Sequence, residues 1–369
     1  MPKPSSVPVR VGIVGAGAVT GYHHVPALRL DPRAELVALC DTNQELLARR
    51  ASQWDVPWTT TDPEQLCHRE DVDAVVVATP NHTHCPITLA AVESGKHVMC
   101  EKPLGLSAQQ AQQMLQAAQA AGVVHMTAFT YRFAPSMKYL LHLLRTGSLG
   151  QPRHFRSQRF LDWPETSWGW RQYRATAGAG DLYDMTIHRL DFAMGLLGPL
   201  ARVCGAVARF APRDTTPEGT PCPPSEVDDW SALLGIFRSG ATGVWEGTTL
   251  AKGYHLRGFG HEWAEVNGSE ATAVYRLHEP NVILLGRHGE DLQPRSVPVE
   301  FLKPQDSPRP TEGDDPATLF RYDLMWEFVS AIVQGRDAVP SFADGYRAQQ
   351  VADAVLESFQ QGRWVELEL

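Results

Sequence analysis

The sequence has no long uncharged apolar run and no excess of basic residues. A membrane-spanning helix needs about 20 consecutive apolar residues, so we expect none here, and the mean hydropathy of −0.25 agrees. Lys and Arg number 33 against 42 Asp and Glu, a net charge of −9. That charge argues against nucleic acid or an anionic membrane as a partner, because both attract basic surfaces.

Cysteine is also scarce, and the spacing of the cysteines does not indicate a metal site. None of the six cysteines forms a Cys-x-x-Cys pair, which argues against structural zinc and against a disulfide framework. We expect no metal, reduced thiols and a cytoplasmic protein. The segment before Arg10 lacks the apolar stretch of a signal peptide and is expected to be a short disordered lead-in.

A chain of 369 residues predicts two domains, and the pattern changes near residue 131. Residues 1–130 alternate short β-rich runs with helical patterns, as in a parallel sheet built from βαβ units. The expected strands are 9–14, 35–40, 74–78, 97–100 and 123–129, and the expected helices are 43–53, 83–93 and 107–122.

Residues 131–369 predict an α+β domain with a largely antiparallel sheet. Two Pro-rich stretches, 211–226 and 303–316, are interpreted as surface loops. The expected helices are 135–145, 319–333 and 345–360, and the expected strands are 152–160, 203–210, 231–237, 241–246 and 364–369, with a hairpin turn at Ser239-Gly240.

A glycine-rich turn follows the first strand and precedes a helix. Gly15 permits a tight turn, and Gly17 lets the backbone approach a pyrophosphate, which the N–H groups of the helix start at Ala18 and Val19 would bind. Thr20 departs from this pattern, because a third glycine is expected at its position. The turn predicts a dinucleotide site in a doubly wound parallel sheet.

Asp41 ends the second strand, 24 residues after Gly17, where a carboxylate can accept from an adenosine ribose 2′-OH. The alternative is a helix N-cap, and one residue could serve both purposes. Because Asp41 would repel a 2′-phosphate and Thr42 and Asn43 supply no arginine, NAD is preferred, with NADP as the alternative.

Two further strand ends carry polar residues. Thr79, Pro80 and Asn81 follow the third run and are predicted to line the nicotinamide half of the cofactor, unless they form a plain turn. Glu101 and Lys102 follow the fourth run. Lys102 could stabilise oxyanion character on a substrate, or it could form a salt bridge that closes the strand end. Glu101 is expected to serve the cofactor or the lysine.

An acid–histidine helix follows a glycine-rich entry at 178–180. Asp184, His188 and Asp191 share one face of this expected helix. A carboxylate beside an imidazole suits proton transfer near neutral pH. Carboxylate–imidazole metal ligation and a solvated surface helix are the alternatives. His23 and His24 are interpreted as packing or capping residues.

The segment 161–174 is rich in aromatic residues, among them Trp163, Trp168 and Trp170. Aromatic faces with cationic neighbours suit a sugar ring, and we hypothesise that Trp170 and Arg171 border the substrate. A structural aromatic cluster or an oligomer contact is the alternative.

Taken together, these motifs resemble the Gfo/Idh/MocA family of oxidoreductases. The resemblance rests on residues between 9 and 191: Gly15-Ala16-Gly17, Asp41, Thr79-Pro80-Asn81, Glu101-Lys102-Pro103, Tyr131-Arg132-Phe133 and Asp184-x-x-x-His188. Besides Thr20, one further departure is Thr186, which stands where many relatives have glycine.

The resemblance implies an α/β protein with an N-terminal Rossmann domain and a C-terminal domain whose large, mostly antiparallel open sheet forms homodimers or homotetramers. It implies NAD(P)-dependent oxidation or reduction of sugars, inositols or related polyhydroxylated compounds. Lys102 and His188 would be the catalytic pair, and Asp184 would bind substrate or orient the histidine. An NAD-dependent glycoside-cleaving enzyme and a non-catalytic dinucleotide sensor are the alternatives.

Overall fold

A computed structural model describes residues 8–256, 259–313 and 315–368. The expected lead-in at 1–7 therefore lies outside the described residues. The chain forms two compact units whose first boundary falls between Thr130 and Tyr131.

The first unit is built on a six-stranded sheet in the order β3-β2-β1-β4-β5-β6, and every pairing in it is parallel. The strands are β1 (Val9–Val14), β2 (Ala34–Cys40), β3 (Trp58–Thr60), β4 (Ala74–Val77), β5 (His97–Cys100) and β6 (His125–Thr127). This order is that of a doubly wound fold, in which ligands bind beyond the carboxyl ends of the strands where the order reverses. The predicted parallel sheet is thus confirmed.

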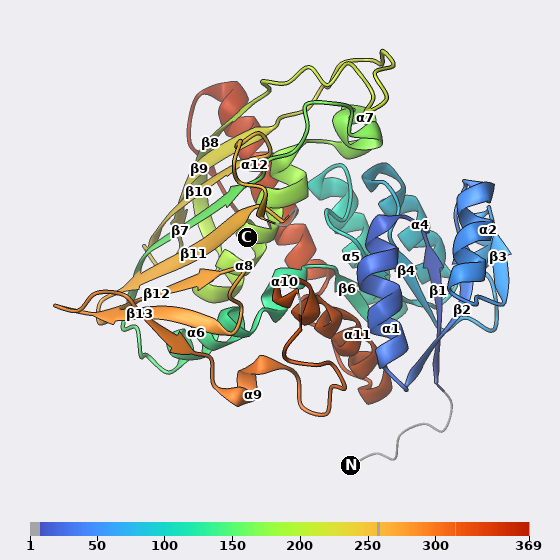
Figure 1. The fold of residues 1–369 in the computed structure, drawn as a ribbon, viewed down its shortest axis with the longest axis horizontal. Coiled ribbons are helices and arrows are strands. Elements are labelled where there is room, and N and C mark those ends of the chain that lie inside the picture. Colours follow the sequence, from blue (N-terminus) through green and yellow to red (C-terminus); the bar gives the residue numbers. More distant parts are fainter. Residues whose placement is uncertain (1–7, 257–258, 314, 369) are drawn as a thin grey trace. The chain divides into compact units, whose positions relative to one another are not determined.

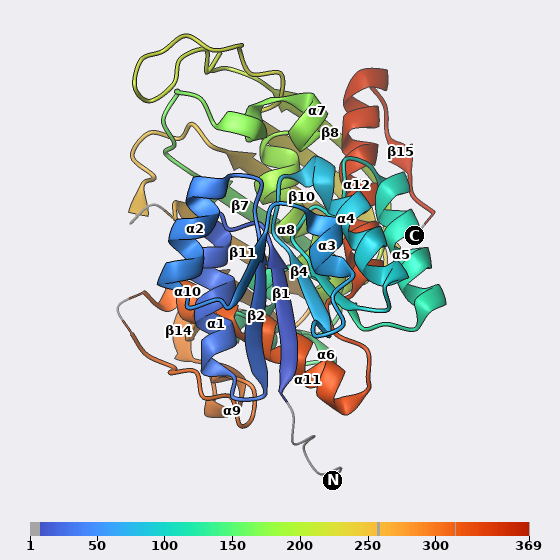
Figure 2. The ribbon, with the colours of Figure 1, turned by 90° about the vertical axis from the view of Figure 1, so that its right-hand side faces the viewer.

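Helices cover both faces of this sheet, with α1 and α2 on one face and α3, α4 and α5 on the other (Figure 2). Local signals explain two of them. Asn43 caps α2 by accepting from the Leu46 amide, and Ser107 caps α5, which ends at left-handed Gly122. The helices are η1 (Thr20–His24, a π-helix), α1 (Val25–Leu30), α2 (Gln44–Gln53), α3 (Pro63–Cys67), α4 (Asn81–Glu93) and α5 (Ala108–Ala121).

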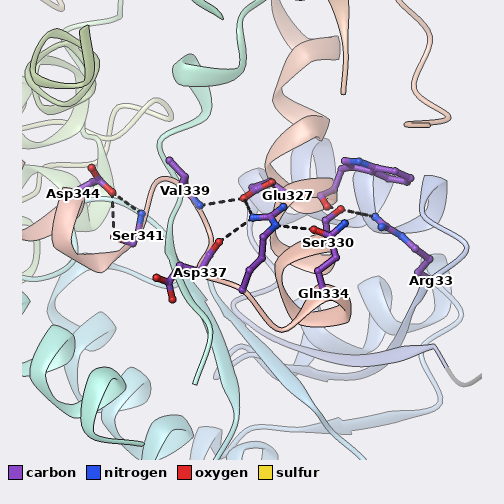
Figure 3. Close-up of polar contacts among 10 residues, drawn as sticks. Arg33, Glu327, Ser330, Gln334, Asp337, Val339, Ser341 and Asp344 are labelled. Carbon is purple, nitrogen blue, oxygen red and sulfur yellow. Dashed lines mark hydrogen bonds and ion pairs between the residues drawn. The ribbon is translucent and has the colours of Figure 1, made fainter. Parts of the chain in front are cut away.

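A distant segment, residues 318–346, also belongs to the first unit. Its helix α11 (Asp323–Gln334) packs against α1 and β1. The Arg33 guanidinium donates to the Ser330 hydroxyl at 3.0 Å and lies 3.7 Å from the ring centroid of Trp326 (Figure 3). The sequence-based division at 130/131 assigns these residues to the second domain, whereas here they complete one face of the parallel sheet.

The end of this segment is fastened to β6. The Thr127 amide donates to the Pro340 carbonyl at 3.0 Å, and the Thr127 hydroxyl donates to the Ser341 carbonyl at 2.9 Å. Phe342, which begins α12 (Phe342–Gln361), is buried in the hydrophobic core of the first unit. Asp344 then accepts from the Ser341 amide and holds the start of the helix (Figure 3).

The second unit contains a nine-stranded sheet in the order β14-β13-β12-β11-β7-β10-β9-β8-β15. All its pairings are antiparallel except that of β10 with β7, so the predicted mostly antiparallel sheet is confirmed. The strands are β7 (Pro152–Phe160), β8 (Leu200–Ala208), β9 (Trp230–Phe237), β10 (Thr242–Thr248), β11 (His261–Gly268), β12 (Ala271–Arg276), β13 (Val282–Arg287), β14 (Gln293–Ser296) and β15 (Val365–Glu366). Four of these, β11 to β14, were not expected.

Helices α6 and α8 lie on one face of this sheet (Figure 1). On the face that points away from them, Leu234 of β9 and Val244 of β10 are exposed. The remaining helical segments are η2 (Thr130–Phe133), α6 (Pro135–Arg145), η3 (Gly169–Gln172), α7 (Arg174–Ala177), η4 (Leu182–Thr186, a π-helix), α8 (Ile187–Leu197), α9 (Val299–Leu302), α10 (Pro316–Leu319) and η6 (Phe320–Tyr322).

Gly15 allows β1 to turn closely past the end of β4. Its φ of +105° suits glycine, and a Cβ at this position would lie 2.3 Å from the Ala78 carbonyl oxygen. Gly17 differs, because a Cβ there would meet no atom within 4 Å. Glycine is therefore required at position 15 by the backbone conformation and the close packing, whereas the fold itself would accept a side chain at position 17.

We expect Gly15→Ala to destabilise the first unit by roughly 2 kcal/mol or more, because it adds backbone strain and a clash with backbone atoms. Gly17→Ala is the matched control and should change stability by about 1 kcal/mol or less. Urea and thermal unfolding of both variants would measure this difference. Equal midpoints for the two variants would contradict the role given to Gly15.

Candidate active site

The glycine turn ends in a buried threonine where a third glycine was expected. Thr20 is fully buried, and its hydroxyl donates to the Gly15 carbonyl at 2.6 Å. This side chain therefore closes the turn from inside. Thr20 begins the π-helix η1, and π-helical turns often mark functional sites.

Asp41 ties the glycine turn to the next βα connection. Its Oδ2 accepts from the Ala16 amide at 2.8 Å, and its Oδ1 accepts from the Asn43 amide at 2.8 Å. Asn43, not Asp41, is the N-cap of α2. The Asp41 carboxylate is thus held in a fixed orientation beside the turn.

Glu101 and Lys102 follow β5, and a histidine from the glycine-turn helix reaches them. His24 Nε2 lies 2.9 Å from Glu101 Oε1, and Glu101 Oε2 accepts from the Lys102 amide at 3.3 Å. Burial opposes ionisation of Glu101, but the hydrogen bond and charge of His24 and the charge of Lys102 outweigh it, so the pKa of Glu101 lies below its ordinary value. The interpretation of His24 as a packing or capping residue misses this bond.

His84 connects the turns after β4 and β5. Its Nδ1 lies 2.7 Å from the Pro103 carbonyl oxygen, and its Nε2 lies 2.8 Å from the Thr79 carbonyl oxygen. The side chain is almost completely buried, and burial lowers the pKa of His84 although both carbonyl oxygens oppose that effect. Sequence reasoning missed His84, although its place one turn after Pro80-Asn81 was a usable signal.

The structure therefore brings most predicted cofactor residues to the carboxyl ends of neighbouring strands in the first unit. Gly15 and Gly17 follow β1, Asp41 follows β2, and Thr79 with Asn81 follows β4. Asn81 is buried and begins α4, and the Thr83 hydroxyl donates to the Thr79 hydroxyl at 2.7 Å.

In the second unit, Asp184 lies in η4 and His188 in the first turn of α8. His188 is 6% exposed, and its ring meets that of Tyr131 edge to face, with centroids 4.6 Å apart. Asp191, on the same expected helix face, is paired with Arg132, which donates to both its carboxylate oxygens, at 2.5 and 2.7 Å. Two residues of the Tyr131-Arg132-Phe133 motif thus support this helix.

A cluster of buried polar side chains stabilises η4. The Thr186 hydroxyl donates to Asp181 Oδ2 at 2.9 Å and accepts from Arg189 Nη2 at 2.6 Å, and the Ser231 hydroxyl donates to the same Asp181 oxygen at 2.7 Å. Thr186 is completely buried. Its departure from the family pattern therefore contributes to the support of the helix.

The glycine-rich entry to η4 is a close packing site and not simply a flexible one. A Cβ on Gly180 would lie 1.7 Å from the Asp228 carbonyl oxygen. The Asp228 carboxylate accepts from the Gly180 amide at 2.8 Å and from the Leu182 amide at 2.9 Å. Burial raises the pKa of Asp228 to about 6, although these hydrogen bonds oppose the effect.

The aromatic segment is joined to the Pro-rich loop 211–226, which is not wholly a surface loop. Gln172 is fully buried, accepts from the Trp168 amide at 2.9 Å and donates to the Pro223 carbonyl at 2.8 Å. The guanidinium carbon of Arg171 lies 4.4 Å from the ring centroid of Trp170. The predicted substrate residues are therefore paired with each other.

The fold and the glycine turn define a class of protein. The space beside Gly17 would be filled by a Cβ, so the turn fits a pyrophosphate group, and the doubly wound sheet supplies the helix N-terminus behind it. Among the described residues no group of His, Cys, Asp or Glu could hold a metal, and no helix there is long and apolar enough to cross a membrane. The doubly wound sheet and its glycine turn define a dinucleotide-binding protein.

The chain belongs to the Gfo/Idh/MocA family. Residues 9–129 match the family model described as an oxidoreductase family with an NAD-binding Rossmann fold, and residues 137–274 match its C-terminal domain. The predicted family, fold class, oxidoreductase activity and NAD cofactor are thereby confirmed.

Two named relatives are similar to this chain over nearly their whole length. The chain is 28% identical to levoglucosan dehydrogenase of Pseudarthrobacter phenanthrenivorans over 97% of this chain and 98% of that protein. It is 27% identical to myo-inositol 2-dehydrogenase of Thermotoga maritima over 98% of this chain and 99% of that protein.

Solved structures agree with this relationship. A levoglucosan dehydrogenase in complex with NADH and levoglucosan has a TM-score of 0.88 at 26% identity, covering 98% of this chain and 100% of that one. An oxidoreductase domain protein from Kribbella flavida has a TM-score of 0.88 at 30% identity, with the same coverage.

Asp228 predicts a pH dependence of stability. Its folded-state pKa of about 6 lies above the ordinary aspartate pKa of 3.8, so between these values the folded chain holds a proton that the unfolded chain has released. The contribution of Asp228 to the free energy of unfolding therefore falls by about 3 kcal/mol as pH rises through this window, and then stays constant.

Asp228→Asn removes this titration. We expect the stability of the wild type relative to this variant to fall between pH 4 and pH 7, as measured by urea unfolding at several pH values. A difference between the two proteins that does not vary with pH would contradict the raised pKa.

Proposed function

We propose that this oxidoreductase transfers a hydride between NAD and a sugar, an inositol or a related polyhydroxylated compound. The observation that carries this proposal is the turn after β5, where His24, Glu101 and His84 hold the backbone around Lys102. The names of the relatives, which include levoglucosan and myo-inositol dehydrogenases, support the substrate class.

The catalytic roles fall to three residues. When bound, NAD supplies the hydride acceptor or donor. The His188 imidazole takes the proton of the reacting hydroxyl, and the Lys102 ammonium stabilises the negative charge that develops on the same oxygen. Asp184 orients the substrate or the imidazole. Tyr131 packs on the His188 ring, which supports a fixed direction for proton transfer.

The cofactor site is proposed at the carboxyl ends of the parallel strands. Backbone amides beyond Gly17 would bind the pyrophosphate, and the Asp41 carboxylate would accept from the adenosine ribose. The full proposed set is Gly15, Gly17, Ala18, Val19, Asp41, Thr79, Pro80, Asn81, Glu101 and Lys102.

Residues 1–130 are proposed as the dinucleotide-binding domain, to which 304–313 and 318–346 are added by their packing, and the rest of residues 131–369 as the substrate-binding and oligomerisation domain. Trp170 and Arg171 would border the substrate together with Asp184 and His188. The exposed apolar residues on the open sheet, such as Leu234, support a homodimer or homotetramer. All six cysteines are free thiols, which supports a place in the reducing cytoplasm.

A screen of sugars, inositols and their keto forms for a change in NADH absorbance tests the activity. We expect turnover with at least one polyol, and Lys102→Met or His188→Asn should lower it by about 10²-fold or more because each removes a proton-transfer or charge-stabilising group. NADH binding should survive His188→Asn.

Gly17→Ala is the control for this experiment, because it should weaken NADH binding while the protein stays folded. Near-normal turnover in either site variant would contradict the assigned roles. Sugar release without accumulation of NADH would point to NAD-dependent glycoside cleavage, and NADH binding without any chemistry would point to a sensor.

Asp41 predicts the coenzyme preference. We expect wild-type kcat/KM to favour NAD, and Asp41→Asn to shift the NADP-to-NAD ratio upward by about tenfold or more, since a nearby like charge costs about 1.4 kcal/mol or more. Glu45→Gln removes an exposed acid from the first turn of α2 and should leave the ratio unchanged. Equal shifts in both variants would show a general effect of charge.

A further inference from the structure

Two consecutive histidines at the end of η1 are buried and have opposite hydrogen-bonding roles. His23 Nε2 lies 3.3 Å from Arg321 Nη1, and His24 Nε2 lies 2.9 Å from Glu101 Oε1. Arginine only donates and an ionised carboxylate only accepts. His23 therefore accepts a hydrogen bond, whereas His24 donates one.

The acceptor of the His24 bond is almost enclosed. The side chain of Glu101 is 12% exposed and that of His24 is 2% exposed. A buried carboxylate is costly unless donors surround it. Here one carboxylate oxygen accepts from His24 and the other from the Lys102 amide, so the imidazole and the backbone of the lysine share one anion.

We propose that His24 is a positioning residue for Lys102, since it holds Glu101 as an oriented anion whose second oxygen fixes the lysine backbone. This inference rests on the proposed function, which assigns Glu101 and Lys102 to the coenzyme site and Lys102 also to catalysis. His24 acts through Glu101 and needs no contact of its own with coenzyme or substrate.

Three elements present charged or titratable groups to Glu101. His24 comes from η1, His84 from α4, and Lys102 follows Glu101 itself; the Cys100 thiol precedes it. Replacing His24 by a residue without a donor leaves His84 and Lys102 in place but removes the hydrogen bond. A hydrogen bond to a charged group of about 1.5–3 kcal/mol corresponds to roughly 1–2 pKa units.

The first test follows Glu101 directly. We would titrate the protein without coenzyme, labelled with ¹³C at the glutamate carboxyl carbons, by NMR, and assign the Glu101 signal from its loss in Glu101→Gln. In His24→Leu the Glu101 pKa should rise by roughly 1–2 units. His24→Gln places an amide donor near the same point and should restore most of the wild-type value.

His23→Leu is the matched control. This variant makes the same change at the neighbouring, similarly buried position of the same π-helix. In the wild type, however, the His23 ring contacts Arg321 and not Glu101. It should leave the Glu101 titration unchanged even if it lowers the unfolding midpoint. If His24→Leu does not fold, His24→Phe keeps a ring of similar size without a donor.

The second test uses NADH as the probe and measures its dissociation constant against pH by protein fluorescence. NADH binding should weaken on acidification as Glu101 becomes protonated, and the midpoint should lie roughly 1–2 units higher in His24→Leu than in the wild type, with rescue by His24→Gln. An unchanged Glu101 titration or an unchanged NADH midpoint in the variant that lacks a donor would overturn the proposal. A wild-type protein that binds no NADH would instead overturn the proposed function.

Discussion

Carboxylates buried at the ends of strands can exist in this chain only where a donor is fixed against them, because an unpaired buried charge is far more costly than a hydrogen-bonded one. Glu101 illustrates this constraint. Its bond to His24 joins the turn after β5 to the helix that follows the glycine turn. Two segments that lie 77 residues apart in sequence are thereby held in one arrangement at the carboxyl edge of the parallel sheet.

In the second unit, buried charges around helix α8 are likewise paired with opposite charges. Arg132 neutralises Asp191, and Arg159 pairs with Glu262 at 3.0 Å although both side chains are almost fully buried. Breaking one partner of such a buried pair typically costs 3–5 kcal/mol. The residues that support His188 therefore tolerate little change, and this would suit the proposed role of His188 as a base whose ring keeps one direction.

Sequence reasoning identified the elements whose signals are local. The parallel strands, the cap at Ser107 and the end at Gly122 were all legible, because apolar runs and capping residues act over a few positions. It missed β11 to β14, and two of these strands show why: β14 is exposed along its whole length, and the inward face of β11 is not purely apolar. Glu262 points inward in β11, where it meets Arg159 and Tyr275, and no alternation of apolar residues reveals a partner that lies 103 positions away.

Within the candidate site, the residue types were predictable and their supports were not. Glycine-turn spacing and strand-end polarity indicated Gly15, Asp41 and Lys102, whereas His24 and His84 acquire their roles only when three strand ends meet. The partners of His84 are two backbone carbonyls, which carry no mark in the sequence. The partner of His24 is the Glu101 carboxylate, which the sequence singled out, but no local pattern indicates that these two residues meet.

The buried residues that position the candidate site also indicate which parts of the chain can change to alter substrate specificity. Residues beneath η4 and around Glu101 are buried and paired, so substitution there changes stability together with function. The aromatic segment is anchored through buried Gln172, while Arg171 stays exposed. Backbone bonds such as that from the Ser167 amide to the Thr215 carbonyl hold the segment as well. Its outward side chains can therefore change while these anchors stay in place. Under the proposed function, Trp170 and Arg171 border the substrate while Lys102 and His188 carry the chemistry, so changes in this segment would alter substrate choice and leave the proposed catalytic pair in place.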